Sequence, residues 1–186
     1  MALLESAPHA EDFLAPDFRL RDVIWDRDVS RDEVAGPHGM LVMFMCNHCP
    51  YVQRILDGIV AVGRDYQQSG VGIVAINPND PAVVPEDSPE RMRQLAHEKR
   101  FTFPYLFDPS QDTARAYGAV CTPEFMLFDR DLRLVWHGQF DDARPGNDRP
   151  VTGRDLRAAL DALCLNRPIP EPPARSVGCS IKWRPA

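Results

Sequence analysis

The sequence predicts a single α/β domain in which helices cover both faces of a mixed β-sheet. Residues 40–45 and 71–76 are short apolar runs separated by an amphipathic segment, and such a strand–helix–strand unit makes a parallel strand pair. Residues 124–129 and 132–138 are extended segments joined by only two residues, so they must be antiparallel. A last amphipathic segment follows at residues 152–164. Parallel and antiparallel pairs together make the predicted sheet mixed.

The first half of the chain builds the centre of this sheet. Residues 12–39 alternate between apolar and polar side chains and predict a small hairpin or an extended leader. The run "MLVMFM" at residues 40–45 is nearly continuous, which is typical of a strand buried on both faces. Residues 50–68 predict an amphipathic helix that Gly70 ends. Its apolar stripe consists of Val52, Ile55, Leu56, Ile59 and Val60.

Capping residues mark the later helices. Ser88 is expected to cap a helix that runs to about Arg100, with a proline at its first position. Thr152 is expected to cap the last helix, because an acidic residue follows three positions later. A short extended piece and a short helix are expected between them, at residues 103–108 and 110–118.

The domain divides into a core and two flanking segments. We expect residues 1–38 to be an N-terminal extension, residues 39–164 the core and residues 165–186 a C-terminal tail. The tail is too rich in proline to form a helix. Its Ile181 and Trp183 predict that it docks back onto the core as a strap.

Composition narrows the functional classes. The 186 residues are 44% hydrophobic and 26% charged, which is typical of a globular domain. The formal net charge of −6 argues against nucleic acid as the main partner. No apolar run approaches the roughly 18 residues that span a bilayer, and the N-terminus does not resemble a secretory signal. We therefore expect no membrane partner and a cytoplasmic location, where most of the five cysteines should be reduced.

Two cysteines are the strongest functional signal. Cys46 and Cys49 follow the first central strand where a helix begins, and open α/β sheets place their sites at such positions. A helix N-terminus favours a thiolate, which is the reactive form of cysteine. We expect the Cys46 sulfur to face solvent and to attack a substrate disulfide. Cys49, a turn further in, would then resolve the mixed disulfide.

The residues between the two cysteines are expected to tune the pair. A partly charged His48, with Asn47 beside it, would stabilise the Cys46 thiolate and hence the reduced form. The couple would then be more oxidising than thioredoxin, whose potential is roughly −270 mV. The alternative is a solvated His48 without a tuning effect.

Several motifs together resemble a known family. The segments "APDFRLRD", "CNHCPYV", "INPND", "PEDSPE", "CTPEF", "GQFDDARPGND" and "GCSIKW" are similar to thioredoxin-like, peroxiredoxin-like proteins of the alkyl hydroperoxide reductase and thiol-specific antioxidant superfamily. The resemblance covers nearly the whole chain. It implies a thioredoxin fold with a redoxin-type N-terminal extension and a Cys46–Cys49 dithiol. It also implies that Thr122 and Pro123 form a cis-proline edge where a partner backbone would pair.

The sequence departs from this family at two places. Thioredoxins carry a buried acid six residues before the first cysteine, where this chain has Met40. If Cys49 is aligned with a peroxidatic cysteine, the proline and threonine that precede it are replaced by Val42 and Cys46. Dithiol–disulfide exchange is therefore the preferred function, and a thiol peroxidase using the same dithiol is the alternative. Arg54 and Arg144 are the candidates for a peroxide-activating arginine.

The remaining cysteines leave further alternatives. Cys121 lies two residues before Pro123, so it is either a buried filler or a thiol near the dithiol. Cys179 is either part of the structural strap or a third redox thiol. A zinc site is a rival reading, because C-x-x-C is half of a tetrahedral site that Cys121, Cys179 or His48 could complete. A non-catalytic thioredoxin-like module would not need both cysteines of the pair.

The preferred function implies particular partners. The dithiol carries electrons itself, so we expect no organic cofactor and no metal. The partners would be protein or small-molecule thiols and disulfides, together with an external thiol reductant. The sequence leaves the oligomeric state open.

Overall fold

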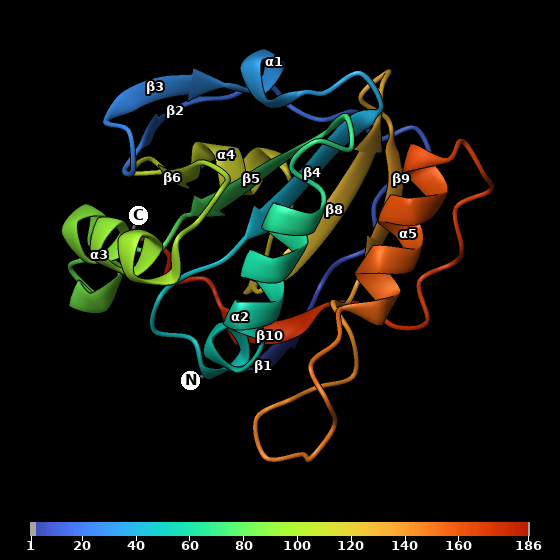
Figure 1. The fold of residues 1–186 in the computed structure, drawn as a ribbon. Coiled ribbons are helices and arrows are strands. Elements are labelled where there is room, and N and C mark those ends of the chain that lie inside the picture. Colours follow the sequence, from blue (N-terminus) through green and yellow to red (C-terminus); the bar gives the residue numbers. More distant parts are fainter. Residues whose placement is uncertain (1–2, 186) are drawn as a thin grey trace.

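A mixed seven-stranded sheet forms the centre of the molecule (Figure 1). The computed structural model describes residues 3–185. The strands lie in the order β3-β2-β6-β5-β4-β8-β9. β4 pairs in parallel with β5 and antiparallel with β8, which confirms the predicted mixed sheet. The strands are β2 (Arg19–Asp22), β3 (Arg27–Ser30), β4 (Gly39–Phe44), β5 (Val71–Asn77), β6 (Tyr105–Phe107), β8 (Glu124–Asp129) and β9 (Leu134–Gly138).

Helices cover both faces of this sheet, as the sequence predicts. In Figure 1, α2 and α5 lie in front of the sheet and α4 lies behind it. None of the helices in residues 3–185 has the length and apolar character needed to cross a membrane. The helices are α1 (Arg31–Val34), α2 (Pro50–Asp65), the 3-10 helix η1 (Pro85–Asp87), α3 (Pro89–Lys99), α4 (Asp112–Ala116) and α5 (Arg154–Cys164).

β4 divides the hydrophobic core into two layers. Its side chains alternate between the two faces, as the pleat of a strand requires. Leu41 and Met43 pack into the cluster under α2, α3 and α5, whereas Met40, Val42 and Phe44 pack into the cluster under α4. All five side chains are buried. The strand buried on both faces is thereby confirmed.

The helix starts confirm one predicted cap and correct another. The Ser88 hydroxyl accepts a hydrogen bond from the backbone N–H of Arg91, as predicted. The prediction for α5 is wrong, because its N-cap is Gly153, with φ 66°, rather than Thr152. The buried carboxylate of Asp141 accepts hydrogen bonds from the N–H groups of Thr152 and Gly153, both at 2.7 Å. A distant side chain thus satisfies donors that precede the helix.

A second sheet of three strands lies beneath the first and joins both ends of the chain (Figure 1). It consists of β1 (Leu3–Glu5), β10 (Val177–Ser180) and β7 (Cys121–Thr122), in the order β1-β10-β7. The C-terminal segment thus lies against the body as a strand. Beyond β10, Ile181 is buried, and the Arg115 guanidinium lies 4.4 Å from the centre of the Trp183 ring.

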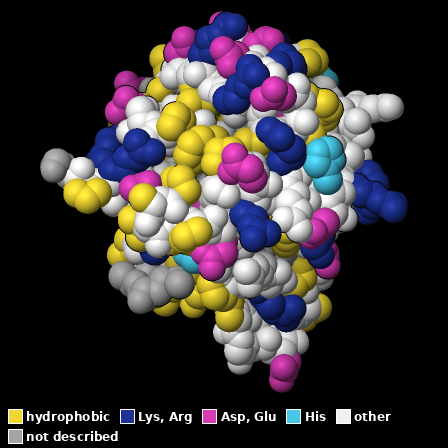
Figure 2. Space-filling view, turned by 90° about the vertical axis from the view of Figure 1, so that its left-hand side faces the viewer, with side chains coloured by type: hydrophobic (Ala, Val, Ile, Leu, Met, Phe, Trp, Pro, Cys, Tyr) yellow, Lys and Arg dark blue, Asp and Glu magenta, His cyan; other side chains and the backbone are white. Residues whose placement is uncertain are grey.

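The face beside α3 carries mixed charge. Figure 2 shows basic and acidic side chains interspersed over it around apolar patches. Ion pairs in the β2–β3 region illustrate this mixing, with Arg21 3.0 Å from Asp26 and Arg27 3.1 Å from Glu33. Exposed pairs of this kind contribute little stability, typically about 0–1 kcal/mol.

Candidate active site

Cys46 and Cys49 lie in the turn that joins β4 to α2. Cys49 is the N-cap of α2, and Pro50 is the first residue of the helix. A proline is tolerated there because the first N–H groups of a helix have no partner within it. The backbone N–H of Gln53 donates to the Cys49 carbonyl at 2.9 Å. The pair therefore occupies the carboxyl end of a central strand and the beginning of a 16-residue helix.

Both sulfurs are buried, and the expected exposure of Cys46 is wrong. Cys46 and Cys49 are each 0% exposed. The physical reason is that Thr122 of β7 lies against both sulfurs, with His48 beside Cys46 and Cys179 of β10 beside Cys49. These residues take the place that the sequence-based prediction gave to solvent.

The two sulfurs converge on Thr122, the residue before a proline. The Cys46 Sγ lies 3.1 Å from the Thr122 hydroxyl, and the Cys49 Sγ lies 3.1 Å from the Thr122 carbonyl oxygen. The peptide bond between Thr122 and Pro123 is cis, as the family resemblance implies. Segments more than 70 residues apart in the chain thus meet at one point.

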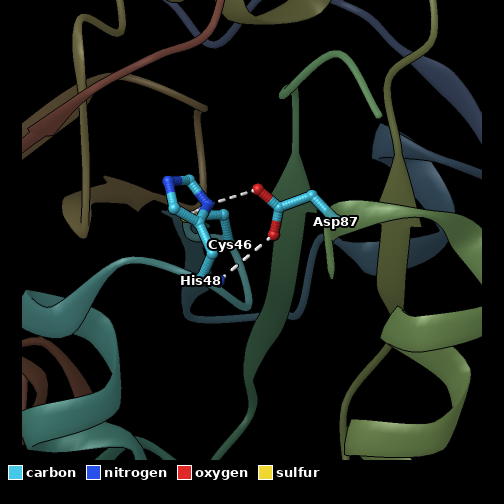
Figure 3. Close-up of side chains that lie close together, drawn as sticks. All are labelled: Cys46, His48 and Asp87. Atoms are coloured by element: carbon cyan, nitrogen blue, oxygen red, sulfur yellow. Dashed lines mark hydrogen bonds and ion pairs between the residues drawn. The ribbon is translucent and has the colours of Figure 1, made fainter. Parts of the chain in front are cut away.

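Asp87 is a site residue that the sequence analysis missed (Figure 3). Its fully buried carboxylate lies 2.6 Å from the Nδ1 of His48 and accepts hydrogen bonds from the Asn47 N–H at 2.7 Å and the Asn79 side chain at 2.8 Å. The same His48 nitrogen lies 3.6 Å from the Cys46 sulfur. Asp87 belongs to the polar connection after β5, and no local pattern shows that this connection folds back onto the cysteine turn.

Asp87 changes what His48 can do for Cys46. Burial opposes ionisation of Asp87, but hydrogen bonds from His48 and Asn79 hold the pKa of its carboxyl below the usual range. A positive charge on His48 would therefore be neutralised first by Asp87. The structure thus places a second ionisable group, Asp87, beside the one histidine that the sequence suggested for tuning, and the tuning effect itself stays a prediction.

Asn47 lies between the cysteines but faces the neighbouring loop. Its side chain donates to the Glu86 carbonyl at 2.9 Å and accepts from the Tyr105 hydroxyl at 3.0 Å. Its carbonyl accepts from the Gln53 side chain at 3.0 Å. These contacts fix the shape of the turn, and a direct effect of Asn47 on the sulfurs stays a prediction.

The negative charge of the reduced pair falls on Cys49. A hydrogen bond from the Cys46 thiol lowers the pKa of Cys49 to about 5 although burial opposes this, and hydrogen bonds from the Cys179 thiol and the Val52 N–H act in the same direction. Burial raises the pKa of Cys46 well above its ordinary value, and the Cys49 sulfur and the Asp87 carboxylate add to this increase. The sequence placed the thiolate on Cys46. The difference arises because the Cys46 and Cys179 thiols both donate to the Cys49 sulfur, whereas Cys46 is more completely desolvated and lies near the Asp87 carboxylate.

The edge expected to receive a partner backbone is already occupied. β10 pairs antiparallel with β7, with Cys179 opposite Thr122 and Ser180 opposite Cys121. The Cys179 sulfur lies 2.7 Å from the Cys49 sulfur. Cys179 therefore lies in the docked tail and also beside the dithiol, so the two suggested locations are the same place. A redox role for it stays a prediction.

Cys121 and Cys164 have simpler surroundings. Burial raises the pKa of Cys121 strongly, and the carboxylate of Glu124, 3.6 Å from its sulfur, adds to the increase. Glu124 also lies 2.9 Å from His137, to which the sequence analysis gave no role. Cys164 is half-buried at the end of α5. Cys121 is therefore a buried thiol that is kept protonated.

A metal ion would find a different set of ligands from the one the C-x-x-C pair suggests. Cys46, His48 and Asp87 offer three ligand atoms within 4.8 Å of one another. Cys49 is not among these three residues. A structural zinc site needs four protein ligands, so the predicted rival with both cysteines as ligands lacks support from this geometry.

Comparison with solved structures identifies two relatives that match along nearly the whole chain. An uncharacterized conserved protein from Geobacillus kaustophilus is 48% identical in sequence, with a TM-score of 0.97, and the match covers 100% of this chain and 98% of that chain. A hypothetical protein from Sinorhizobium meliloti 1021 is 42% identical, with a TM-score of 0.94, and the match covers 98% of this chain and 99% of that chain.

A more distantly similar solved structure identifies the fold. The thioredoxin domain of a thiol-disulfide oxidoreductase from Bacteroides vulgatus is 16% identical, with a TM-score of 0.60, and the match covers 81% of this chain and 97% of that chain. At this identity the likeness shows the fold alone, and it confirms the predicted thioredoxin fold. The comparison with curated proteins finds no match. The model of the AhpC/TSA family matches residues 13–137, which include both cysteines of the turn and Thr122. The chain belongs to the AhpC/TSA family.

Proposed function

We propose that the protein is a thiol–disulfide oxidoreductase whose working dithiol is Cys46 and Cys49. The observation that supports this most is the convergence of both sulfurs on Thr122, the residue before the cis-proline. Membership of the AhpC/TSA family supports a redox role for the site. The low pKa of Cys49 supports it as well, because the reduced pair then carries a thiolate at neutral pH.

The first chemical step begins with a proton transfer within the pair. The Cys49 thiolate accepts the Cys46 proton along the hydrogen bond that joins them, which leaves the thiolate on Cys46. The Cys46 thiolate attacks one sulfur of a substrate disulfide and releases the other as a thiolate. His48, which lies 3.6 Å from Cys46, balances the charge that forms there.

The second step resolves the mixed disulfide. Cys49 passes its proton to the released thiolate and attacks the Cys46 sulfur. This forms the Cys46–Cys49 disulfide and releases the second substrate thiolate. The substrate gains two electrons and the dithiol loses two, so an external thiol must reduce the protein again.

The test compares two oxidants. Reduced protein is mixed with a disulfide-bonded model protein or with hydrogen peroxide, quenched with acid and analysed by mass spectrometry for the Cys46–Cys49 disulfide. We expect fast oxidation by the disulfide and slow oxidation by peroxide. C46S should abolish the reaction with the disulfide, whereas C49S should stop at the mixed disulfide between Cys46 and the substrate. The matched control C164S, at the end of α5, should react like the wild type. No reaction of the wild type with the disulfide would overturn the proposal.

A thiol peroxidase is the second candidate, and family membership is the observation that favours it. The arginines proposed to activate peroxide have other partners. Arg54 donates to the Arg149 carbonyl at 2.7 Å, and Arg144 donates to the Gln139 side chain and to the carbonyls of its own loop. Faster oxidation by peroxide than by the disulfide would establish this second activity.

A further inference from the structure

β10 of the C-terminal tail occupies the edge of β7, where a partner backbone was expected to pair, and specific contacts hold it there. An added Cβ at Gly178 would lie 2.0 Å from the Thr122 carbonyl oxygen, so β10 lies this close to the edge only because that residue is a glycine. Just before the strand, the buried Ser176 hydroxyl donates to the Gly138 carbonyl at 2.7 Å. Just after it, the Ile181 N–H donates to the Val120 carbonyl at 3.1 Å.

A second anchor holds the chain beyond β10. The Lys182 N–H donates to the Asn79 side chain at 2.8 Å, and the Lys182 carbonyl accepts from the Asp80 N–H at 3.1 Å. Asn79 also donates to Asp87, so the same residue holds the tail and the redox turn. Cys179 is therefore fixed in place by contacts before and after it.

The position of Cys179 is that of a disulfide partner. Its sulfur lies 2.7 Å from the Cys49 sulfur, and bringing the two to the roughly 2.05 Å of a disulfide needs a movement of less than about 1 Å. Cys49 is hydrogen-bonded to both Cys46 and Cys179. It can thus exchange one partner for the other without a large rearrangement.

We propose that Cys179 is a third redox thiol, which displaces Cys46 from the Cys46–Cys49 disulfide and leaves the oxidised protein with a Cys49–Cys179 disulfide. This inference rests on the proposed dithiol function. In the step, the Cys179 sulfur attacks the Cys49 sulfur, the bond between Cys46 and Cys49 breaks, and the proton of Cys179 passes to Cys46. The exchange involves no net oxidation, because one disulfide and one thiol are present before and after it.

The surrounding charges favour attack by Cys179 after the Cys46–Cys49 disulfide has formed rather than before. In the reduced protein, burial and the Cys49 thiolate raise the pKa of Cys179 to about 12, so Cys179 is protonated and inactive. Once Cys49 enters a disulfide its negative charge is gone, whereas the positive charge of Lys182 still favours a thiolate on Cys179. Burial, the largest cause of the raised pKa, still opposes the thiolate, but Cys179 is a better nucleophile after the first disulfide has formed than before it. The departing Cys46 is protonated beside His48, at 3.6 Å.

The consequence is a change of both access and chemistry. A Cys49–Cys179 disulfide would tie β10 covalently to the start of α2 and hold the edge closed. Cys46 would be free again as a thiol. An external thiol reductant would have to attack the Cys49–Cys179 bond and, in doing so, would release the tail.

Disulfide mapping tests the inference on the unmodified protein. Reduced protein is oxidised with a small-molecule disulfide, quenched with acid, alkylated with N-ethylmaleimide and digested with trypsin. Cleavage places Cys46 and Cys49 on the peptide of residues 32–54 and Cys179 on the peptide of residues 176–182. A Cys46–Cys49 disulfide therefore lies within one peptide, whereas a bond to Cys179 joins two peptides. Fragmentation of the joined pair identifies the alkylated cysteine.

The outcomes separate the inference from the proposed function. We expect most of the oxidised wild type to give the joined peptides with the alkyl group on Cys46, and a nonreducing gel should show a monomer. C179S should give the disulfide within residues 32–54 instead, and C164S should behave like the wild type. Wild type that carries only the Cys46–Cys49 disulfide, with Cys179 alkylated, would overturn the inference and still support the dithiol function. If neither disulfide forms, the proposed function itself fails.

Discussion

The two sides of the dithiol are built from different parts of the chain. On the Cys46 side, ionisable side chains dominate, with His48 and Asp87 2.6 Å apart. On the Cys49 side, backbone dominates, because the Thr122 carbonyl and the strand β10 lie directly over the sulfur. We propose that the first side tunes the Cys46 sulfur and that the second limits access to the pair.

A third region provides an internal control for this comparison. Glu124 is fully buried and lies 2.9 Å from His137, much as Asp87 lies beside His48. Its other oxygen accepts hydrogen bonds from the N–H groups of Val120 and Cys121, so it holds the strand before the cis-proline. A buried histidine–carboxylate pair thus also occurs where neither residue contacts Cys46 or Cys49, and there we expect no effect on the dithiol.

The first expected effect is on access to the buried sulfurs, and the variant Gly178→Ala tests it. The new Cβ would lie 2.0 Å from the Thr122 carbonyl oxygen, and overpacking of this kind costs about 1–3 kcal/mol. If this cost falls on the docking of β10, the open state becomes about 5- to 150-fold more populated. Alkylation of Cys179 in the reduced protein, followed by mass spectrometry, should accelerate accordingly.

Gly146→Ala is the matched control for this variant. Gly146 has φ 84°, and an added Cβ there meets no atom within 4 Å among the described residues. It therefore introduces backbone strain without a clash over the dithiol. Equal alkylation rates in the two variants would show that β10 does not control access.

The next effect concerns charge, through Asp87→Asn. This change keeps the shape of the side chain but removes the negative charge that raises the pKa of Cys46. We expect the pKa of Cys46 to fall, and the thiolate of the reduced pair to become more stable relative to the disulfide. The pH dependence of Cys46 alkylation measures the first effect. An unchanged profile would remove Asp87 from the account.

His48→Asn should act in the opposite direction and more weakly. Without the histidine, the Asp87 charge beside the pair has no partner in His48, which disfavours the negative charge shared by Cys46 and Cys49, so the reduced form loses stability. The reduction potential should fall by about 30 mV, which corresponds to a tenfold change in the equilibrium constant. His137→Asn is the matched control and should leave the potential unchanged. If both variants shift the potential equally, the effect is not specific to the Cys46 side.

The last expected effect is a pH dependence of stability. The pKa of Cys49 is lowered to about 5 in the folded protein, whereas a free cysteine has a pKa of about 8.5. The thiolate therefore stabilises the folded, reduced state fully above about pH 8.5, and this contribution is lost as the pH falls towards 5. The free energy of unfolding of the wild type relative to C49S should decline over that range. A difference that does not vary with pH would contradict the lowered pKa.

The sequence predicts the framework well because the framework follows from local patterns. The run at residues 40–45 is apolar at every position, so only a strand buried on both faces suits it. Its order with residues 50–68 and 71–76 then requires a crossover. Thr152 shows the limit of such reasoning. Gly153 is the N-cap instead, and the Thr152 N–H donates to Asp141, eleven residues away.

The candidate site was only half predictable for the same reason. Cys46 and Cys49 are close in sequence, and their spacing reveals the pair. Asp87 and Cys179 reach the pair through contacts across 39 and 130 residues, which only the folded chain brings together. The exposure of Cys46 was predicted wrongly because the tail could be expected to dock, but its landing place could not be derived from its proline content.

The most direct test of the central claim is a redox titration of the protein against glutathione, with free thiols counted by alkylation and mass spectrometry. We expect a two-electron transition that is absent in C49S and in the double variant C46S/C179S, because each lacks a member of both proposed disulfides, and that is unchanged in C164S. Its midpoint should lie above thioredoxin's roughly −270 mV. A wild-type protein whose cysteines stay fully reduced across the titration, or a transition that survives in both C46S and C49S, would contradict the claim that this pair is the working dithiol.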